Sequence, residues 1–141
     1  MIAIGCDHGG LEMKNQIIEH FKKRGMELKD VGCYESRSCD YPVYANKVTD
    51  LVTSGECELG ILVCGTGIGM SIAANKVKGI RAALCGDCFS AQATREHNNA
   101  NVLCLGARVI GPELAFRIAD IFVDTSFSDD ERHNRRIGML E

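Results

Sequence analysis

The sequence predicts an α/β fold with a parallel sheet, because strand-like and helix-like segments alternate along the whole chain. The predicted strands are short and apolar, as in a sheet that is covered on both faces. The predicted helices carry apolar residues at helical spacing on one side. We therefore expect a Rossmann-like three-layer α/β/α sandwich with a five-stranded parallel sheet and a C-terminal helix. The chain has 141 residues and no linker or repeat, so residues 1–141 are expected to form one domain.

Local signals justify the elements of the first half of the chain. The apolar run at 2–6 predicts the first strand, and apolar residues at helical spacing predict a helix from residue 11 that Gly25 ends. A weaker strand is expected at 27–31. Asp40 is the expected N-cap of a helix at 41–52, with Pro42 in its first turn.

The second half continues the alternation. The β-branched run at 60–64 is bounded by glycine and predicts a buried strand. The remaining expected strands are at 80–85 and 102–105. The remaining expected helices are at 68–78, 90–96, 112–123 and 130–139.

The composition narrows the class of protein. The net charge is -3 and the pI is about 5.8, so no strong positive field indicates nucleic acid or an anionic membrane as a partner. No apolar run approaches the roughly 18 residues of a membrane helix, and the N-terminus has no signal-peptide pattern. We therefore expect a cytoplasmic protein whose cysteines are reduced thiols.

Cys85 and Cys88 form a CxxC pair, which leaves a zinc or redox role as a minor alternative. A structural zinc site needs four ligands, and the chain has no second CxxC or HxxxH. We therefore expect no metal.

The loop that follows the apolar run at 60–64 contains the most informative residues. Cys64 is followed by Gly65-Thr66-Gly67-Ile68-Gly69, where glycines let backbone N–H groups approach a ligand. The next helix points the positive end of its dipole at this loop, a setting that favours a thiolate. A P-loop is disfavoured because no Lys-Ser/Thr pair follows, and the dinucleotide fingerprint is imperfect. The loop is therefore interpreted as an oxyanion cradle beside a nucleophile or base.

Other candidates follow the strands or end the helices. Asp7 and His8 come after the first strand and Arg108 after the fifth, so all three lie at the edge where such sheets bind ligands. His97 follows the predicted helix at 90–96, where it is either a proton donor or a helix cap. Arg132 and Arg136 are four residues apart and form either a phosphate clamp or a solvated helix face.

Together these residues resemble the type B ribose-5-phosphate isomerases, whose superfamily includes the galactose-6-phosphate isomerase subunits. The resemblance covers nearly the whole chain. Its motifs are Gly5-Cys-Asp-His-Gly9, Asp40-Tyr-Pro42, Cys64-Gly-Thr-Gly-Ile-Gly69, Ser71-Ile-Ala-Ala-Asn-Lys76, Gly79-Ile-Arg-Ala82, Glu96-His-Asn98, Asn101-Val102, Gly106-Ala-Arg108 and Arg132-His-x-x-Arg136.

The resemblance implies an aldose–ketose isomerase of the pentose phosphate pathway that interconverts ribose 5-phosphate and ribulose 5-phosphate through a cis-enediolate, without a cofactor. It implies that Cys64 is the base, that Thr66 supports it and that Gly65 to Gly69, Ile68 included, form the cradle. His97 matches the ring-opening acid, with Asp7 nearby. The residues that match sugar or phosphate contacts are His8, Asn98, Arg108, Arg132 and Arg136.

The family's features also imply a homo-oligomer, a dimer or a tetramer, with the site at the subunit interface. Some members use a glutamate near this chain's Ala73, but residues 71–75 contain no carboxylate, which favours Cys64 as the base. All motifs occur in one polypeptide, which favours a self-sufficient homo-oligomer, such as a homodimer. Two alternatives stay open: a six-carbon substrate such as allose or galactose 6-phosphate, and a non-catalytic phosphosugar- or nucleotide-binding module.

Overall fold

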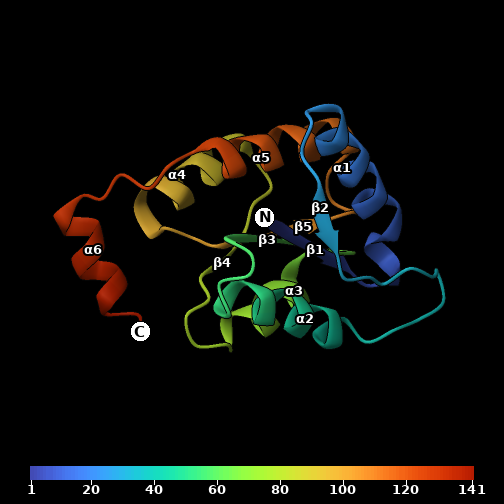
Figure 1. Cartoon of the computed structure of the whole chain (residues 1–141), viewed down its shortest axis with the longest axis horizontal. Coiled ribbons are helices and arrows are strands. Elements are labelled where there is room, and N and C mark those ends of the chain that lie inside the picture. Colours follow the sequence, from blue (N-terminus) through green and yellow to red (C-terminus); the bar gives the residue numbers. More distant parts are fainter.

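The computed structural model describes residues 1–141 and has three layers (Figure 1). All strand pairs in its middle layer are parallel, and their order is β2-β1-β3-β5-β4. The strands are β1 (Ile2–Cys6), β2 (Leu28–Asp30), β3 (Leu59–Cys64), β4 (Ala82–Leu84) and β5 (Val102–Gly106). The predicted three-layer sandwich with a five-stranded parallel sheet is confirmed.

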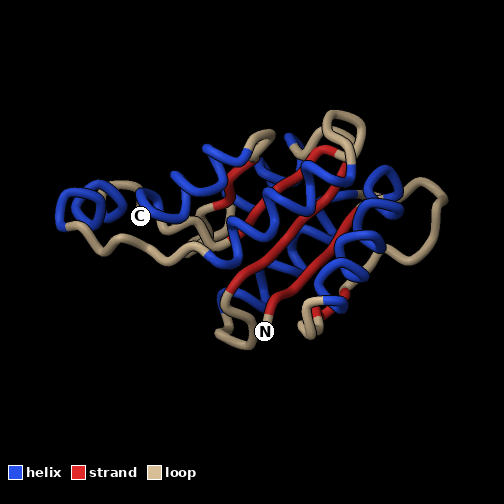
Figure 2. The backbone as a smooth tube through the Cα atoms, turned by 90° about the horizontal axis from the view of Figure 1, so that it is seen from above, coloured by secondary structure: helices blue, strands red, loops and turns tan.

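Helices cover both faces of the sheet. One face carries α1 (Leu11–Lys23), α4 (Cys88–Asn98) and α5 (Pro112–Asp124), and the other carries α2 (Tyr41–Thr53) and α3 (Ile68–Asn75). A single 3₁₀ turn, η1 (His8–Gly10), joins β1 to α1. The C-terminal helix α6 (Glu131–Gly138) contacts α4 and extends beyond the sandwich (Figure 2). None of the helices is both long and apolar enough to cross a membrane.

The central strands are buried along their length because both faces are covered. Ile4, Ile61 and Leu103 pack in the core under α1 and α5, whereas alternate residues such as Leu62 face α2 and α3. Gly60 permits the close approach of α2, because a Cβ there would lie 2.5 Å from Val48 Cγ1. The clusters of buried side chains on the two faces hold the sheet rigid, so the strand ends from which the loops start are fixed in space.

Several element boundaries differ from those predicted. Strand β4 is shorter than the expected 80–85, and α3 ends at Asn75 rather than near residue 78. The Asn75 side chain pairs with both backbone groups of Ala82, which draws the end of α3 to the start of β4. Helix α4 begins before residue 90, because the Asp87 carboxylate accepts the Ser90 N–H at 2.7 Å.

The capping role predicted for Asp40 is wrong in part. Asp40 does occupy the N-cap position of α2, but its side chain makes no capping hydrogen bond. Helix α2 nevertheless begins at Tyr41, with Pro42 in its first turn as predicted.

Candidate active site

Three neighbouring strands bring candidate residues to one edge of the sheet. β1, β3 and β5 pair in register, with Cys6 opposite Val63 and Cys64 opposite Gly106. The chain leaves these strands at Asp7, Gly65 and Ala107, so the loops that follow meet at the carboxyl edge. This is the edge where ligands bind in open parallel sheets.

Cys64 lies at the centre of this edge with only 5% of its surface exposed. The backbone N–H of Gly67 donates to Cys64 Sγ at 3.1 Å. Helix α3 starts at the next residue, so the positive end of its dipole also points toward the sulfur. Cys64 Sγ therefore accepts a backbone hydrogen bond directly before the start of a helix.

Gly67 is required for this geometry. Its φ is 78°, a left-handed conformation that non-glycine residues rarely adopt. A Cβ at this position would also lie 2.9 Å from the carbonyl carbon of Leu105. The Thr66 hydroxyl accepts the N–H of Ile68 at 3.2 Å, which fixes the turn.

The rest of the cradle is held against Arg108 and Tyr41. The Arg108 N–H donates to the Gly65 carbonyl at 2.9 Å, and the Arg108 side chain lies over Gly65. Gly69 packs against the Tyr41 ring so closely that a Cβ would lie 2.8 Å from two ring carbons. The cradle therefore has the Arg108 side chain on one side and an aromatic ring on the other.

Asp7 and His8 adjoin the cradle. The Asp7 carboxylate accepts the N–H groups of Gly9 at 2.9 Å and of Gly10 at 3.2 Å, and the side chain is almost completely buried. His8 Nδ1 accepts the N–H of Cys39 at 3.3 Å. This hydrogen bond assigns the proton of the neutral ring to Nε2, which leaves Nε2 as a donor for an anion.

The other candidates lie elsewhere in the same chain. Helix α4 starts at the carboxyl edge and runs back across the sheet, so His97 and Asn98 at its end lie near the amino ends of the strands. There, the Asn98 carbonyl accepts a hydrogen bond from Arg81, which immediately precedes β4. Within one chain, the structure does not bring His97 or Asn98 to the carboxyl edge with Cys64.

Helix α6, which carries Arg132 and Arg136, lies beside the end of α4 with His97 and Asn98. The rings of His97 and His133 stack with centroids 4.5 Å apart. Partial burial and the nearby charge of His97 lower the pKa of His133. Asp130 caps the helix by accepting the Arg132 N–H at 2.8 Å. Both arginines are exposed. Their side chains are therefore free to bind a ligand that is held outside this chain.

Lys14 is a residue whose role the sequence reasoning missed. Its side chain is 1% exposed, and Nζ donates to both carboxylate oxygens of Asp30 at 2.8 Å and to the Cys33 carbonyl at 2.9 Å. It therefore pins the loop after β2 beside the end of β1. The available signal was its position in the apolar stripe of its helix, three residues before Ile17 and four before Ile18.

Cys85 and Cys88 do not have the character of a reactive pair. Burial, and to a lesser extent the charge of Asp87, raise the pKa of Cys85 to about 11, which disfavours its thiolate. All eight cysteines are free thiols, and no group of three or more His, Cys, Asp or Glu side chains is arranged to hold a metal ion.

Comparison with known proteins identifies relatives over the whole chain. The family model described as Ribose/Galactose Isomerase matches residues 2–140. The ribose-5-phosphate isomerase B of Escherichia coli is 48% identical over 139 residues, which cover 99% of this chain and 93% of that protein. The galactose-6-phosphate isomerase subunit LacB of Clostridium acetobutylicum is 39% identical and is covered over 82% of its length.

Solved structures give the same result. The ribose-5-phosphate isomerase B of Clostridium thermocellum superposes with a TM-score of 0.96 at 50% identity, covering 99% of this chain and 93% of that one. The ribose 5-phosphate isomerase of Thermotoga maritima has the same TM-score and identity, with 99% and 95% covered. Sequence and fold agree over their full length, and the chain therefore belongs to the Ribose/Galactose Isomerase family.

Proposed function

We propose that this protein is an aldose–ketose isomerase that interconverts D-ribose 5-phosphate and D-ribulose 5-phosphate. The observation that carries the proposal is the Cys64 sulfur, which receives the Gly67 N–H at 3.1 Å beside a glycine cradle at the carboxyl edge of the sheet. The solved relatives named as ribose-5-phosphate isomerases share this fold at 50% sequence identity, which supports the substrate class.

The chemistry that this arrangement suits is proton transfer between adjacent carbons. A proton α to a carbonyl is weakly acidic, so its removal requires a base and donors at the oxygen where negative charge develops. Cys64 takes the proton from C2 of the open-chain aldose, and the resulting cis-enediolate is stabilised by N–H groups of the first turn of α3, which have no partners within the helix. Return of the proton to C1, together with transfer of the hydroxyl proton from O2 to O1, gives the ketose with no net oxidation and no cofactor.

The remaining roles belong to cationic and acid groups. The Arg108 guanidinium lies over Gly65 and is placed to bind the sugar or its phosphate. His8, with Nε2 as donor, suits a phosphate oxygen. His97 is the ring-opening acid, and Asp7 lies beside the cradle for the same step. Binding of the remote phosphate orients the reacting carbons over Cys64.

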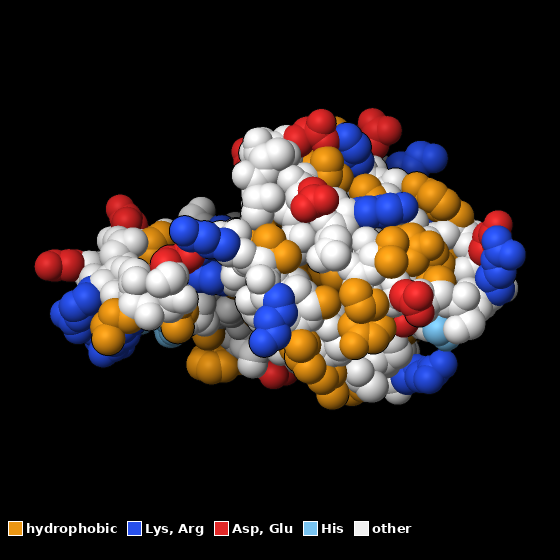
Figure 3. Space-filling view, turned by 90° about the horizontal axis from the view of Figure 1, so that it is seen from below, with side chains coloured by type: hydrophobic (Ala, Val, Ile, Leu, Met, Phe, Trp, Pro, Cys, Tyr) orange, Lys and Arg blue, Asp and Glu red, His pale blue; other side chains and the backbone are white.

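We infer that two copies of the chain complete each site. His97, Asn98, Arg132 and Arg136 lie away from Cys64 in one chain, so a partner must bring its own set to the cradle. Exposed apolar side chains support such a contact beside the cradle: Val43 is 49% exposed, Ile68 51% and Ile72 56%. Hydrophobic atoms also gather on the face formed by α2 and α3 (Figure 3). Such patches mark association surfaces. Light scattering should give a mass of at least twice 15.4 kDa, and a monomer would contradict the shared site.

A coupled isomerase assay without added metal tests the function directly. We expect turnover of ribose 5-phosphate, and Cys64→Ala should lower kcat by about 10²–10⁴-fold, the usual contribution of a general base. Circular dichroism should show an unchanged fold. Near wild-type turnover by Cys64→Ala would remove Cys64 from the role.

A six-carbon substrate is the second candidate, favoured by the similarity to the galactose-6-phosphate isomerase subunit. The same assay should therefore include allose 6-phosphate and galactose 6-phosphate. Preference for either would reassign the substrate. Binding of sugar phosphates without turnover of any would instead indicate a non-catalytic module. If the protein is the isomerase, sugar phosphate should slow the alkylation of Cys64.

A further inference from the structure

The last turn of α4 carries His97 and Asn98 and needs external support. The final carbonyl groups of a helix have no partner within it, and helix ends fray when these groups are left to solvent. Here the chain also turns sharply at Asn99, whose φ of 46° is left-handed. The orientation of His97 and Asn98 therefore depends on what holds the carbonyls of this turn.

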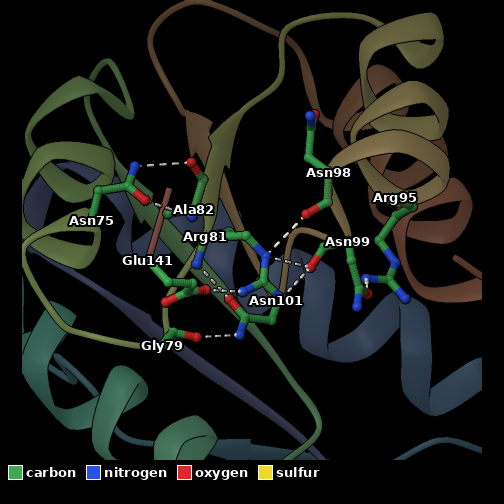
Figure 4. Close-up of polar contacts among 9 residues, drawn as sticks. All are labelled: Asn75, Gly79, Arg81, Ala82, Arg95, Asn98, Asn99, Asn101 and Glu141. Carbon is green, nitrogen blue, oxygen red and sulfur yellow. Dashed lines mark hydrogen bonds and ion pairs between the residues drawn. The ribbon is translucent and has the colours of Figure 1, made fainter. Parts of the chain in front are cut away.

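The Arg81 guanidinium holds two of these carbonyls (Figure 4). Nε donates to the Asn98 carbonyl at 3.0 Å and to the Asn99 carbonyl at 3.2 Å. Nη2 donates to the Asn99 carbonyl at 2.9 Å. A positive charge at a helix C-terminus is also favourable to the helix dipole.

Arg81 is itself fixed at both ends. Its backbone N–H donates to Asn101 Oδ1 at 2.8 Å, just before β4. Its Nη1 pairs with the Glu141 carboxylate at 2.8 Å, and the Arg81 side chain is 20% exposed. The guanidinium is thus a rigid clamp between the sheet, the end of α4 and the segment after α6.

The other donors at this turn serve different acceptors. Arg95 Nη1 donates to Asn99 Oδ1 and to the Ala100 carbonyl, and Ser128 Oγ donates to the Glu96 carbonyl. Burial, and secondarily the charge of Arg81, lower the pKa of Arg95. Among these side chains, Arg81 alone donates to the carbonyl oxygens of Asn98 and Asn99.

We propose that Arg81 is a positioning residue of the isomerase, which holds His97 and Asn98 in the orientation in which they meet the substrate. Arg81 acts through these two residues and touches no substrate itself. This inference rests on the proposed function. The forked geometry is essential, because a lysine ammonium is a point charge that cannot reproduce two directed donors on adjacent carbonyls.

Two variants of Arg81 and one matched control test the proposal. Arg81→Met keeps the aliphatic stem and removes every side-chain donor, whereas Arg81→Lys keeps the stem and the charge but loses the planar fork of donors. Arg24→Met is the control, because Arg24 also bridges two partners, Asp120 at 2.6 Å and Asp124 at 2.8 Å, but lies between α1 and α5. We expect Arg81→Met to lower kcat/KM by about 10²-fold, as small misplacements of reacting groups do. The kcat/KM of Arg81→Lys should lie between those of Arg81→Met and the wild type. The kcat/KM of Arg24→Met should stay within about threefold of the wild-type value, as for surface changes.

Two further readouts separate positioning from loss of stability. Hydrogen exchange in residues 96–101 should be faster in both Arg81 variants than in the wild type and unchanged in Arg24→Met. Millimolar guanidinium should restore part of the activity of Arg81→Met and should not change that of the control.

Full activity in either Arg81 variant, or an equal loss in Arg24→Met, would overturn the proposal. Unchanged exchange at 96–101 would overturn it as well, and this readout needs no turnover. An inactive wild-type chain would refute the proposed function. Hydrogen exchange at residues 96–101 would still decide whether Arg81 clamps the last turn of α4.

Discussion

Replacing Gly67 by alanine tests the cradle most sharply, because the structure gives two separate reasons for glycine. The first is conformational: φ is 78°, and a left-handed conformation costs an L-residue about 1–2 kcal/mol. The second is steric: the new Cβ would lie 2.9 Å from the Leu105 carbonyl carbon and 3.1 Å from its oxygen. Leu105 is a fully buried residue of β5 and cannot move away. Overpacking of this kind adds about 1–3 kcal/mol.

Gly25→Ala isolates the first cost. Gly25 has the same φ of 78° but no atom within 4 Å of the position of a Cβ. Both alanines restrict the unfolded chain equally, so that contribution cancels in the difference. We expect urea unfolding to show a loss of about 1–2 kcal/mol for Gly25→Ala and of about 2–5 kcal/mol for Gly67→Ala.

The activity assay should separate the two variants further. Any shift that relieves the contact with Leu105 moves the Gly67 N–H relative to Cys64 Sγ, so kcat/KM should fall by about 10²-fold in Gly67→Ala. Gly25→Ala should keep wild-type activity because it lies after α1, away from the carboxyl edge. Equal stability of the two variants, together with full activity of Gly67→Ala, would show that the steric reasoning is wrong.

Three further predictions follow. Arg136→Ala should raise KM for ribose 5-phosphate at least tenfold, as loss of a charged phosphate contact does, with Arg135→Ala as the control; an unchanged KM would exclude the clamp. Lys14→Met should lower stability by about 3 kcal/mol in urea, because Asp30 loses the partner of a largely buried ion pair; a loss below about 1 kcal/mol would show that the pair is dispensable. The Ser90 amide and hydroxyl lower the pKa of Asp87, whose ordinary value is 3.8, so its contribution is present above that value and is lost as the pH falls below it. Asp87→Asn should therefore lose less stability than the wild type when melts are taken from pH 5 to pH 2, and identical curves would contradict the capping role.

The fold could be predicted from the sequence because each layer leaves its own local signal. Buried strands such as 60–64 read as apolar runs, and glycine at position 25 marks the end of a helix. The boundaries around β4 could not be predicted, since they depend on the Asn75 side chain pairing with Ala82 across a turn. Likewise, the Asp40 pattern indicated a cap, but in the folded chain that side chain makes no capping hydrogen bond.

The carboxyl-edge part of the site was predictable, because one topological rule places Asp7, Cys64 and Arg108 together. The place of His97 was not, since the direction of α4 carries it to the opposite edge of the sheet, near the amino ends of the strands. Arg81 belongs to the motif Gly79-Ile-Arg-Ala82, but nothing in that motif indicates what its side chain contacts. Its role comes from carbonyl groups that the chain brings near only after the crossover from β4 to β5 is complete.

The pairing of Asn75 with Ala82 has a consequence for how the protein behaves at high concentration. β4 is the outermost strand on its side of the sheet, and an open outer strand is a template onto which another chain can add. The Asn75 carboxamide occupies both the N–H and the carbonyl of Ala82, at 2.8 and 3.0 Å. With three residues in the strand and one already blocked, a foreign strand finds no continuous ladder to extend. This side chain therefore protects the sheet against edge-to-edge aggregation.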